Sequence, residues 1–229
     1  HLPGYYGMVK RLDDALGRIR DALKSLGLQD NTIVLFTADH GCHFKTRNGE
    51  YKRSCHDSSL RVLAALTGLC FVQGGRVTEL FSLVDVAPTL LDACGLRVPQ
   101  HMVGNSIVPI VQHRRTRWPE EVFAQISEAQ VARAVRTRRW KYCVSAPDKH
   151  PSRDVGSDSY VEEALYDLAA DPYELNNLIG YVSHRGVANV LQRRLLRCMA
   201  RAGEARPTIV RAPEVRSGQK QVMPGEERL

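Results

Sequence analysis

One apolar run constrains this chain more than any other feature. Residues 32–37 are continuous, apolar and rich in β-branched side chains, and the run ends on Ala38-Asp39-His40-Gly41. Such a run is typical of a strand covered on both faces, as in a parallel sheet. Ligands of open α/β sheets bind outside the carboxyl ends of the strands. A carboxylate beside an imidazole at that end indicates a metal site rather than an ordinary turn.

The segments around this run predict an α/β fold. Apolar residues recur at steps of three and four from Gly4 to about Leu26, which predicts a helix that ends at Gly27. Helix, short loop and strand form half of a crossover unit. Residues 61–69 are apolar again and predict a second strand. Residues 81–95 predict a strand-like entry and a short helix, with Asp85 as a possible cap.

The character of the chain changes after Pro99. Weakly alternating residues at 122–127 predict a strand, and residues 131–144 predict a hairpin around Arg138-Arg139. A short strand at 163–168 and an amphipathic helix at 187–202 follow. We therefore expect an α/β portion over residues 1–99, a smaller sheet-plus-helix subdomain over 100–205, and a disordered tail over 206–229, which is rich in Pro, Gly and charge.

Composition narrows the class of protein. The 229 residues carry a net charge of +7, which fits either solvated charged surfaces or attraction to anionic substrates. The arginines lack interleaved aromatic residues and a nucleic-acid motif, so we expect no nucleic-acid partner. No apolar segment is long enough to span a membrane. The six cysteines form no C-x-x-C pair, and their even count permits disulfides without requiring them. The cysteines therefore do not indicate whether the protein resides in a reducing or an oxidising compartment.

Several short motifs, in this order, resemble the C-terminal half of a type I sulfatase of the alkaline-phosphatase superfamily. Each motif is weak alone, but together they extend from residue 4 to about residue 200. They are Gly4-Tyr5-Tyr6, Leu12-Asp13-Asp14, Thr37-Ala38-Asp39-His40-Gly41, Lys52, Ser59-Leu60-Arg61-Val62, Leu83-Val84-Asp85-Val86-Ala87-Pro88-Thr89, Ala134-Val135-Arg136-Thr137, Trp140-Lys141-Tyr142, Leu165-Tyr166-Asp167-Leu168 and Glu174-Leu175-Asn176-Asn177-Leu178.

The resemblance implies a fold, a reaction and a set of site residues. The fold is part of a large mixed sheet flanked by helices, followed by a small antiparallel C-terminal sheet with a packed helix. The reaction is hydrolysis of a sulfate ester, on a sulfated small molecule or a sulfated glycan. Asp39 and His40 would ligate one divalent cation. Ca²⁺ is the first choice, and His40 keeps Mn²⁺, Mg²⁺ and Zn²⁺ open, because imidazole nitrogen suits softer ions.

Two further residues acquire roles from the resemblance and from their chemistry. Lys52, thirteen positions after Asp39, would bind the sulfate and neutralise charge in the transition state. His56 would contact the substrate or protonate the leaving group, because histidine titrates near neutrality. A second-layer or loop role for His56 stays open.

The family's nucleophile is formylglycine, made from the first residue of a C/S-x-P-x-R motif, and none of the six cysteines here begins that pattern. The family places this motif and a first pair of acidic metal ligands upstream, so we expect a fragment that is inactive alone. The chain also departs from the family at Leu63, where a proline is usual. That difference leaves the metal site untouched but affects the local turn.

Two alternatives remain at this stage. One is a phosphonate monoester or phosphodiester hydrolase of the same superfamily, which shares the Asp-His pair and the downstream lysine. The other is a non-catalytic, truncated chain that binds anions through its arginines. The sequence specifies neither the oligomeric state nor the cellular location.

Overall fold

A computed structural model describes residues 2–72, 74–114 and 117–215. These residues form two compact units that interleave along the chain. Unit 1 comprises His1–Thr37, Leu63–Val77 and Leu83–Thr116, and unit 2 comprises Ala38–Val62, Thr78–Ser82 and Arg117–Leu229. Each unit consists of several separate stretches of the chain, whereas the predicted division into residues 1–99, 100–205 and 206–229 is sequential. That division stays a prediction.

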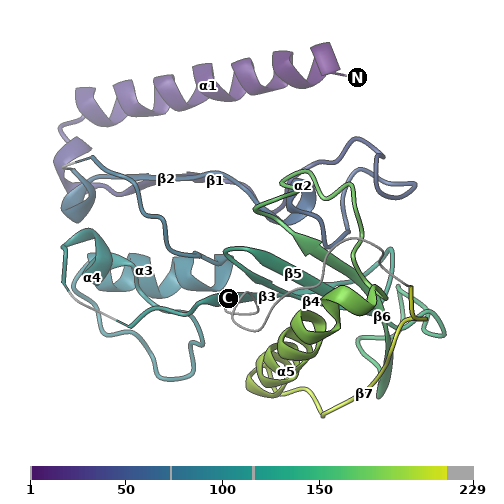
Figure 1. Cartoon of the computed structure of the whole chain (residues 1–229). Coiled ribbons are helices and arrows are strands. Elements are labelled where there is room, and N and C mark those ends of the chain that lie inside the picture. The colour runs from purple at the N-terminus through teal and green to yellow at the C-terminus, as the bar shows by residue number, and fades with distance from the viewer. Residues whose placement is uncertain (1, 73, 115–116, 216–229) are drawn as a thin grey trace. The chain divides into compact units, whose positions relative to one another are not determined.

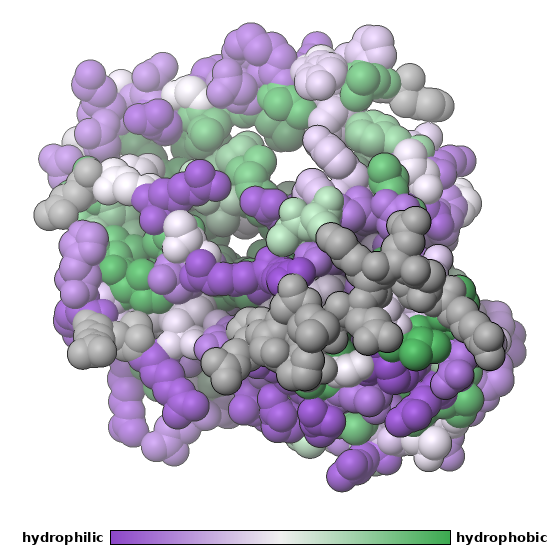
Figure 2. All heavy atoms as spheres, viewed as in Figure 1, coloured by the Kyte–Doolittle hydropathy of each residue, from purple (hydrophilic) through white to green (hydrophobic). Residues whose placement is uncertain are grey.

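Helix α1 (Leu2–Ser25) of unit 1 ends where expected. Gly27 adopts φ +68°, and the Leu28 amide donates to the Leu23 carbonyl at 2.9 Å, which closes a Schellman motif. The helix buries no residue. Its apolar side chains therefore remain on the surface of unit 1, and Figure 2 shows green apolar atoms beside the polar ones along α1, at the top of the view.

The apolar run forms strand β1 (Val34–Thr37), which pairs with β2 (Ala64–Thr67) from Val34↔Thr67 to Thr37↔Ala64. The pairing is antiparallel and every residue of β1 is half-buried. The prediction of a parallel strand covered on both faces is therefore wrong in detail. An apolar run specifies that a strand is to be covered but not the direction of its neighbour.

The remaining elements of unit 1 are short. The expected strand-like entry near residue 83 is a 3₁₀ turn instead, because Leu83–Asp85 leads directly into α3. Asp85 occupies the expected N-cap position, but its side chain makes no capping hydrogen bond and its carboxylate accepts the Asn105 amide at 2.7 Å instead. The elements are η1 (Gln29–Asn31), η2 (Leu69–Phe71), η3 (Leu83–Asp85), α3 (Val86–Ala93) and α4 (Val108–Val111).

Unit 2 is built on a five-stranded sheet with the strand order β3-β4-β5-β6-β7 (Figure 1). Neighbours are antiparallel except β6 and β7, which are parallel. The sheet is therefore mixed, where a purely antiparallel one was expected. The strands are β3 (Glu121–Ile126), β4 (Ala132–Thr137), β5 (Trp140–Ser145), β6 (Ser159–Asp167) and β7 (Thr208–Val210).

Strand β7 corrects the prediction of a disordered tail from residue 206. Thr208–Val210 pairs with β6, because its alternating apolar residue Ile209 packs against the core of unit 2. The rest of the expected tail, residues 216–229, lies outside the described residues.

The two faces of this sheet have different coverings. Helix α5 (Arg185–Arg201), which follows η4 (Val182–His184), covers one face. The core there consists mainly of Val135, Trp140, Tyr142, Leu165, Val187, Leu191, Leu195 and Met199. On the other face, Cys55 packs with Ala134, Cys143, Ala164 and Tyr166. The sheet is thus a platform for the segment of residues 38–62, which we call the site segment.

Two simpler observations complete the fold. All six cysteines are free thiols. Among the helices of the described residues, none is both long enough and apolar enough to cross a membrane.

Candidate functional site

The site segment turns sharply after β1 because its backbone lies against helix α2 (Asp57–Leu60). The Gly41 amide donates to the Ser59 carbonyl at 2.7 Å. A Cβ atom at position 41 would lie 2.2 Å from the Ser58 carbonyl oxygen. Only glycine permits so close an approach between two backbones. The Asp39-His40-Gly41 sequence is therefore held at one place against α2.

Asp39, His40 and Lys52 converge at this turn. The Lys52 Nζ atom lies 2.7 Å from His40 Nε2, and Asp39 Oδ2 lies 3.5 Å from the same ring nitrogen. The other ring nitrogen, Nδ1, lies 2.8 Å from the Gly41 carbonyl oxygen. This geometry requires the proton on Nδ1 and leaves the Nε2 lone pair to accept the hydrogen bond from Lys52. Three of the four predicted site residues thus meet.

The backbone of Lys52 is held from the inside of the site segment. His43 is 2% exposed, and its Nε2 lies 3.1 Å from the Lys52 carbonyl oxygen. The Asn48 side chain donates to the same carbonyl at 3.2 Å. The Lys52 backbone is therefore held by a buried histidine and a half-buried asparagine, while its ammonium group contacts His40.

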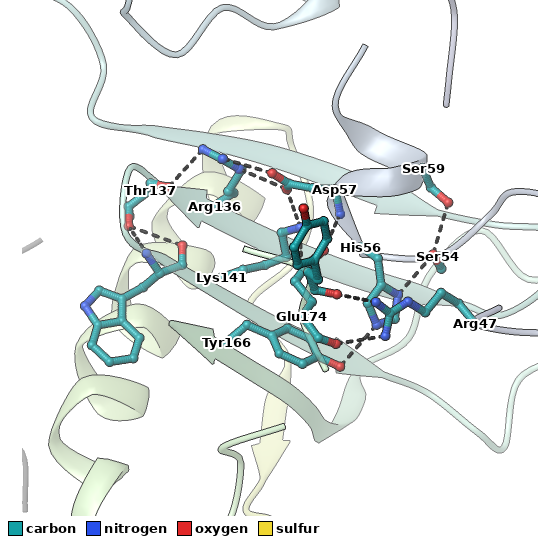
Figure 3. A network of polar contacts seen from close by, with 12 residues as sticks. Arg47, Ser54, His56, Asp57, Ser59, Arg136, Thr137, Lys141, Tyr166 and Glu174 are labelled. Atoms are coloured by element: carbon teal, nitrogen blue, oxygen red, sulfur yellow. Dashed lines mark hydrogen bonds and ion pairs between the residues drawn. The ribbon is translucent and has the colours of Figure 1, made fainter. Parts of the chain in front are cut away.

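His56, the fourth predicted site residue, lies elsewhere. Its ring nitrogens contact Ser54 Oγ and the Tyr166 hydroxyl, each at 3.1 Å (Figure 3). Burial, together with the positive charges of Arg47 and Lys141, lowers the pKa of His56 to about 4. The ring is therefore neutral near pH 7. Within the described part of the chain, none of its hydrogen bonds reaches the other three site residues, and its role in catalysis stays a prediction.

A buried network of ion pairs lies between α2 and the sheet of unit 2 (Figure 3). Lys141, from β5, is 0% exposed, and its Nζ lies 2.5 Å from Asp57 Oδ1 and 2.5 Å from Glu174 Oε1. Arg136, from β4, donates to both oxygens of Asp57 at 3.1 and 3.0 Å. Glu174 also accepts the Asp57 amide at 2.6 Å. Figure 3 shows this network between α2 and the sheet.

The electrostatics of Asp57 follow from these contacts. Burial raises the pKa of its carboxyl, but hydrogen bonds from Arg136 and the charge of Lys141 outweigh that effect and lower the pKa to about 2. Arg47 joins the network from the site segment, because it donates to the Glu174 carbonyl at 2.8 Å. Two carboxylates and two cations at the centre give a balanced cluster, which is what a buried charge requires.

Sequence reasoning missed this network. Asp57, Lys141 and Glu174 are far apart in the chain, and pairing between them cannot be read from local pattern. One signal was present: Lys141 interrupts an otherwise apolar strand, Trp140–Val144. A charged residue at such a position must find a buried partner or destabilise the strand.

Asp39 and His40 offer two donor atoms of the kinds that the expected divalent cation binds. The Asp39 carboxylate is 86% exposed, so it is available to a ligand, and the His40 Nε2 lone pair lies 3.5 Å from it. A carboxylate oxygen and a neutral imidazole nitrogen held in this way fit part of a divalent-cation site. The described residues contain no cluster of three or more potential metal-ligating side chains. Asp39 and His40 therefore fit as two ligands and not as a complete set.

Comparisons with known proteins place the chain in a family. Residues 49–201 match the N-sulphoglucosamine sulphohydrolase C-terminal family, and residues 1–96 match the sulfatase family. Arylsulfatase K of Bos taurus is 31% identical over 184 residues, which cover 76% of this chain and 32% of the relative. This chain therefore belongs to the type I sulfatases and corresponds to a C-terminal portion of the family's fold. It spans about a third of the length of that relative.

Solved structures agree with the fold. A protein from a Bacteroides thetaiotaomicron locus for glycosaminoglycan metabolism superimposes with a TM-score of 0.72 at 25% identity, over 86% of this chain and 42% of that one. A phosphonate monoester hydrolase of Agrobacterium radiobacter gives a TM-score of 0.68 at 27% identity, over 86% and 40%. The expected alkaline-phosphatase-like α/β class is confirmed.

Proposed function

We propose that this chain supplies one half of the active site of a metal-dependent sulfatase. The convergence of Asp39, His40 and Lys52 within 3.5 Å at the end of β1 carries the proposal. Membership of the sulfatase family supports sulfate esters as the substrate class. The similarity to a protein of glycosaminoglycan metabolism favours a sulfated sugar among those esters.

Each residue has a separate task in this proposal. Once the Lys52 ammonium turns from His40 toward the sulfate, the Asp39 carboxylate and the freed His40 Nε2 lone pair would hold a divalent cation, with Ca²⁺ as first choice and Mn²⁺, Mg²⁺ or Zn²⁺ as alternatives. A cation bound there would supply Lewis-acid polarisation of the sulfate oxygens. The Gly41 carbonyl keeps the proton of His40 on Nδ1, so that Nε2 faces the ligand. The Lys52 ammonium would neutralise the charge that develops on the sulfate oxygens.

Two consequences concern the rest of the reaction. The 229 residues contain no C/S-x-P-x-R motif, so we expect this chain alone to be inactive. Covalent catalysis loses several orders of magnitude in rate without its nucleophile. His56 would act from the layer below, either on the leaving group or through Tyr166.

A phosphonate monoester hydrolase is the second candidate, because one solved neighbour at 27% identity is such an enzyme. Both reactions involve a tetrahedral oxyanion, and the Lys52–His40 arrangement fits either. A protein that contains this chain together with the nucleophile-bearing part of the fold should be assayed with matched aryl sulfate and aryl phosphonate esters. A higher kcat/KM on the sulfate supports the proposal, and the reverse result supports the alternative.

The metal assignment needs its own experiment. In the same protein, Asp39→Ala should abolish turnover and lower the metal content measured by elemental analysis. Asp148→Ala is the matched control, because Asp148 is an exposed carboxylate of the same unit that pairs only loosely with Lys149. Full metal content and near-normal turnover in Asp39→Ala would refute the assignment of Asp39, at the end of β1, as a metal ligand.

A further inference from the structure

Three polar side chains form a row across the sheet of unit 2. Arg136 pairs in register with Lys141, and Lys141 pairs with Tyr166. Residues directly opposite one another in a sheet project from the same face. All three contact the site segment: Arg136 and Lys141 bind Asp57, and Tyr166 binds His56 (Figure 3). The row is therefore a docking platform for the start of α2.

Lys141 is the centre of that row. Its ammonium group lies between two carboxylates that belong to different segments, Asp57 at the start of α2 and Glu174 in the turn after β6. Both carboxylates are mostly buried, and Glu174 is 2% exposed. Without the ammonium group, two negative charges would face each other away from water, which a buried site does not tolerate. Of its two cationic partners on the sheet, Asp57 would then keep only Arg136, and its placement would weaken.

Helix α2 transmits this placement to the site. The Gly41 amide is bonded to the Ser59 carbonyl, and the Gly41 backbone rests against Ser58. Inside the site segment, Ser54 Oγ lies 3.1 Å from Ser59 Oγ and 3.1 Å from His56 Nδ1. A displacement of α2 therefore moves Ser59, which contacts Gly41, the residue after His40, and Ser54, two residues after Lys52.

We propose that Lys141 is a positioning residue: its buried ammonium group fixes α2 on the sheet, and α2 fixes Asp39-His40 and Lys52 in their mutual arrangement. The role of these three residues in sulfate-ester hydrolysis rests on the proposed function, but the positional coupling does not. Lys141 itself touches neither His40 nor Lys52, and it acts through Asp57, Ser59 and Gly41.

The test is amide hydrogen exchange by mass spectrometry on the 229-residue chain carrying Lys141→Met. We expect the peptide that contains the Gly41 and His43 amides to exchange at least about tenfold faster, which corresponds to a loss of about 1.4 kcal/mol in local protection. Peptides from α5 and β5 should keep their slow exchange, because their core faces the other side of the sheet.

Arg133→Met is the matched control. Arg133 is also buried and forms an ion pair with Glu204 at 2.8 Å, but its contacts involve neither α2 nor the site segment. We expect this variant to lose stability without accelerated exchange at Gly41. Equal acceleration in both variants, or none in Lys141→Met, would overturn the proposal.

A second variant covers the case in which Lys141→Met does not fold. Asp57→Asn keeps the Lys141–Glu174 pair and weakens only the link to α2. It should also accelerate exchange at Gly41, because it weakens the contacts of Asp57 with both Lys141 and Arg136, and an unchanged rate contradicts the coupling. If Gly41 responds as expected but a longer protein hydrolyses no sulfate ester, the proposed function fails while the positioning role of Lys141 stands.

Discussion

The ring of His56 lies 3.1 Å from the Tyr166 hydroxyl, although 110 positions separate the two residues in the chain. This contact connects the site segment to strand β6. Together with the Ser54 hydroxyl, it occupies both ring nitrogens of a histidine that is half-buried and neutral. The imidazole is therefore better suited to join two parts of the unit than to exchange protons with solvent.

The first prediction concerns this neutral ring. Burial and the nearby positive charges of Arg47 and Lys141 lower the pKa of His56 from 6.5 to about 4, so between these pH values the unfolded chain binds a proton that the folded chain does not. The free energy of unfolding should therefore fall as the pH falls from about 6.5 to about 4. His56→Gln should flatten this dependence, measured by urea unfolding followed by tryptophan fluorescence. His101→Gln, at an exposed histidine, is the control, and an unchanged slope in His56→Gln would contradict the prediction.

Asp57 should dominate the next step of acidification. Its folded pKa of about 2 lies below the unfolded value of 3.8, so its contribution is complete above about pH 4 and is lost as the pH falls toward 2. After allowance for solvent screening, that contribution is at most roughly 2 kcal/mol. Asp57→Asn should remove this part of the acid transition in the same urea experiment. Asp148→Asn, at an exposed carboxylate, should leave the transition in place.

Gly41 offers a steric prediction. An added Cβ at position 41 would lie 2.2 Å from the Ser58 carbonyl oxygen, a backbone atom that cannot turn away. Gly41→Ala should lower the stability of unit 2 by about 1–3 kcal/mol, as overpacking does. Gly49→Ala is the matched control, because nothing lies within 4 Å of its added Cβ. Thermal unfolding of both variants measures the difference in stability. Equal midpoints would show that the backbones at Gly41 and Ser58 can move apart without loss of stability.

A fourth prediction concerns catalysis. In a protein that also carries the nucleophile, His56→Gln should retain its metal, because His56 contacts neither Asp39 nor His40 among the described residues. If His56 assists the leaving group, its loss should cost about two to four orders of magnitude on alkyl or sugar sulfates and less on nitrophenyl sulfate. Equal losses on both substrates would assign His56 a structural role. Asp39→Ala, by contrast, should fail on every substrate.

The exposed face of α1 leads to a prediction about solubility. Leu12 and Ile19, on its apolar stripe, are each more than half exposed, and contiguous apolar surfaces of this kind promote association. The replacements Leu12→Gln and Ile19→Gln should reduce self-association of the 229-residue chain, measured by light scattering over a range of concentrations. Ser25→Gln, at an exposed polar position of the same helix, should not. A chain that is already monomeric at all concentrations would contradict the expectation.

Local features were predictable from the sequence, and long-range ones were not. Gly27 ends α1 because a residue with positive φ is needed there, and the hairpin at Arg138-Arg139 follows from two flanking β-rich runs. The prediction that β1 pairs in parallel was wrong, because an apolar run does not determine the direction of the neighbouring strand. The sequence predicts a strand-like entry where Leu83–Asp85 forms a 3₁₀ turn, since three residues are too few to show a period.

The candidate site divides in the same way. Asp39, His40 and Lys52 are close in sequence, and motif order was enough to group them. Their supports were beyond sequence reasoning, because the contacts of Lys141 and Tyr166 join segments that only the sheet brings together. Burial is what distinguishes Lys141 from a solvated lysine, and burial is a property of the fold.

The separation of these partners also sets an order of events during synthesis of the chain. Asp57 binds Arg136, Lys141 and Glu174, which follow it by 79, 84 and 117 positions. The residues that carry the proposed chemistry therefore leave the ribosome long before the sheet that supports them. Closing loops of this length costs entropy that only the finished sheet can offset. The site should thus be the last part of unit 2 to form, and a nascent chain that stops short of Glu174 should leave Asp39 and Lys52 without a common support.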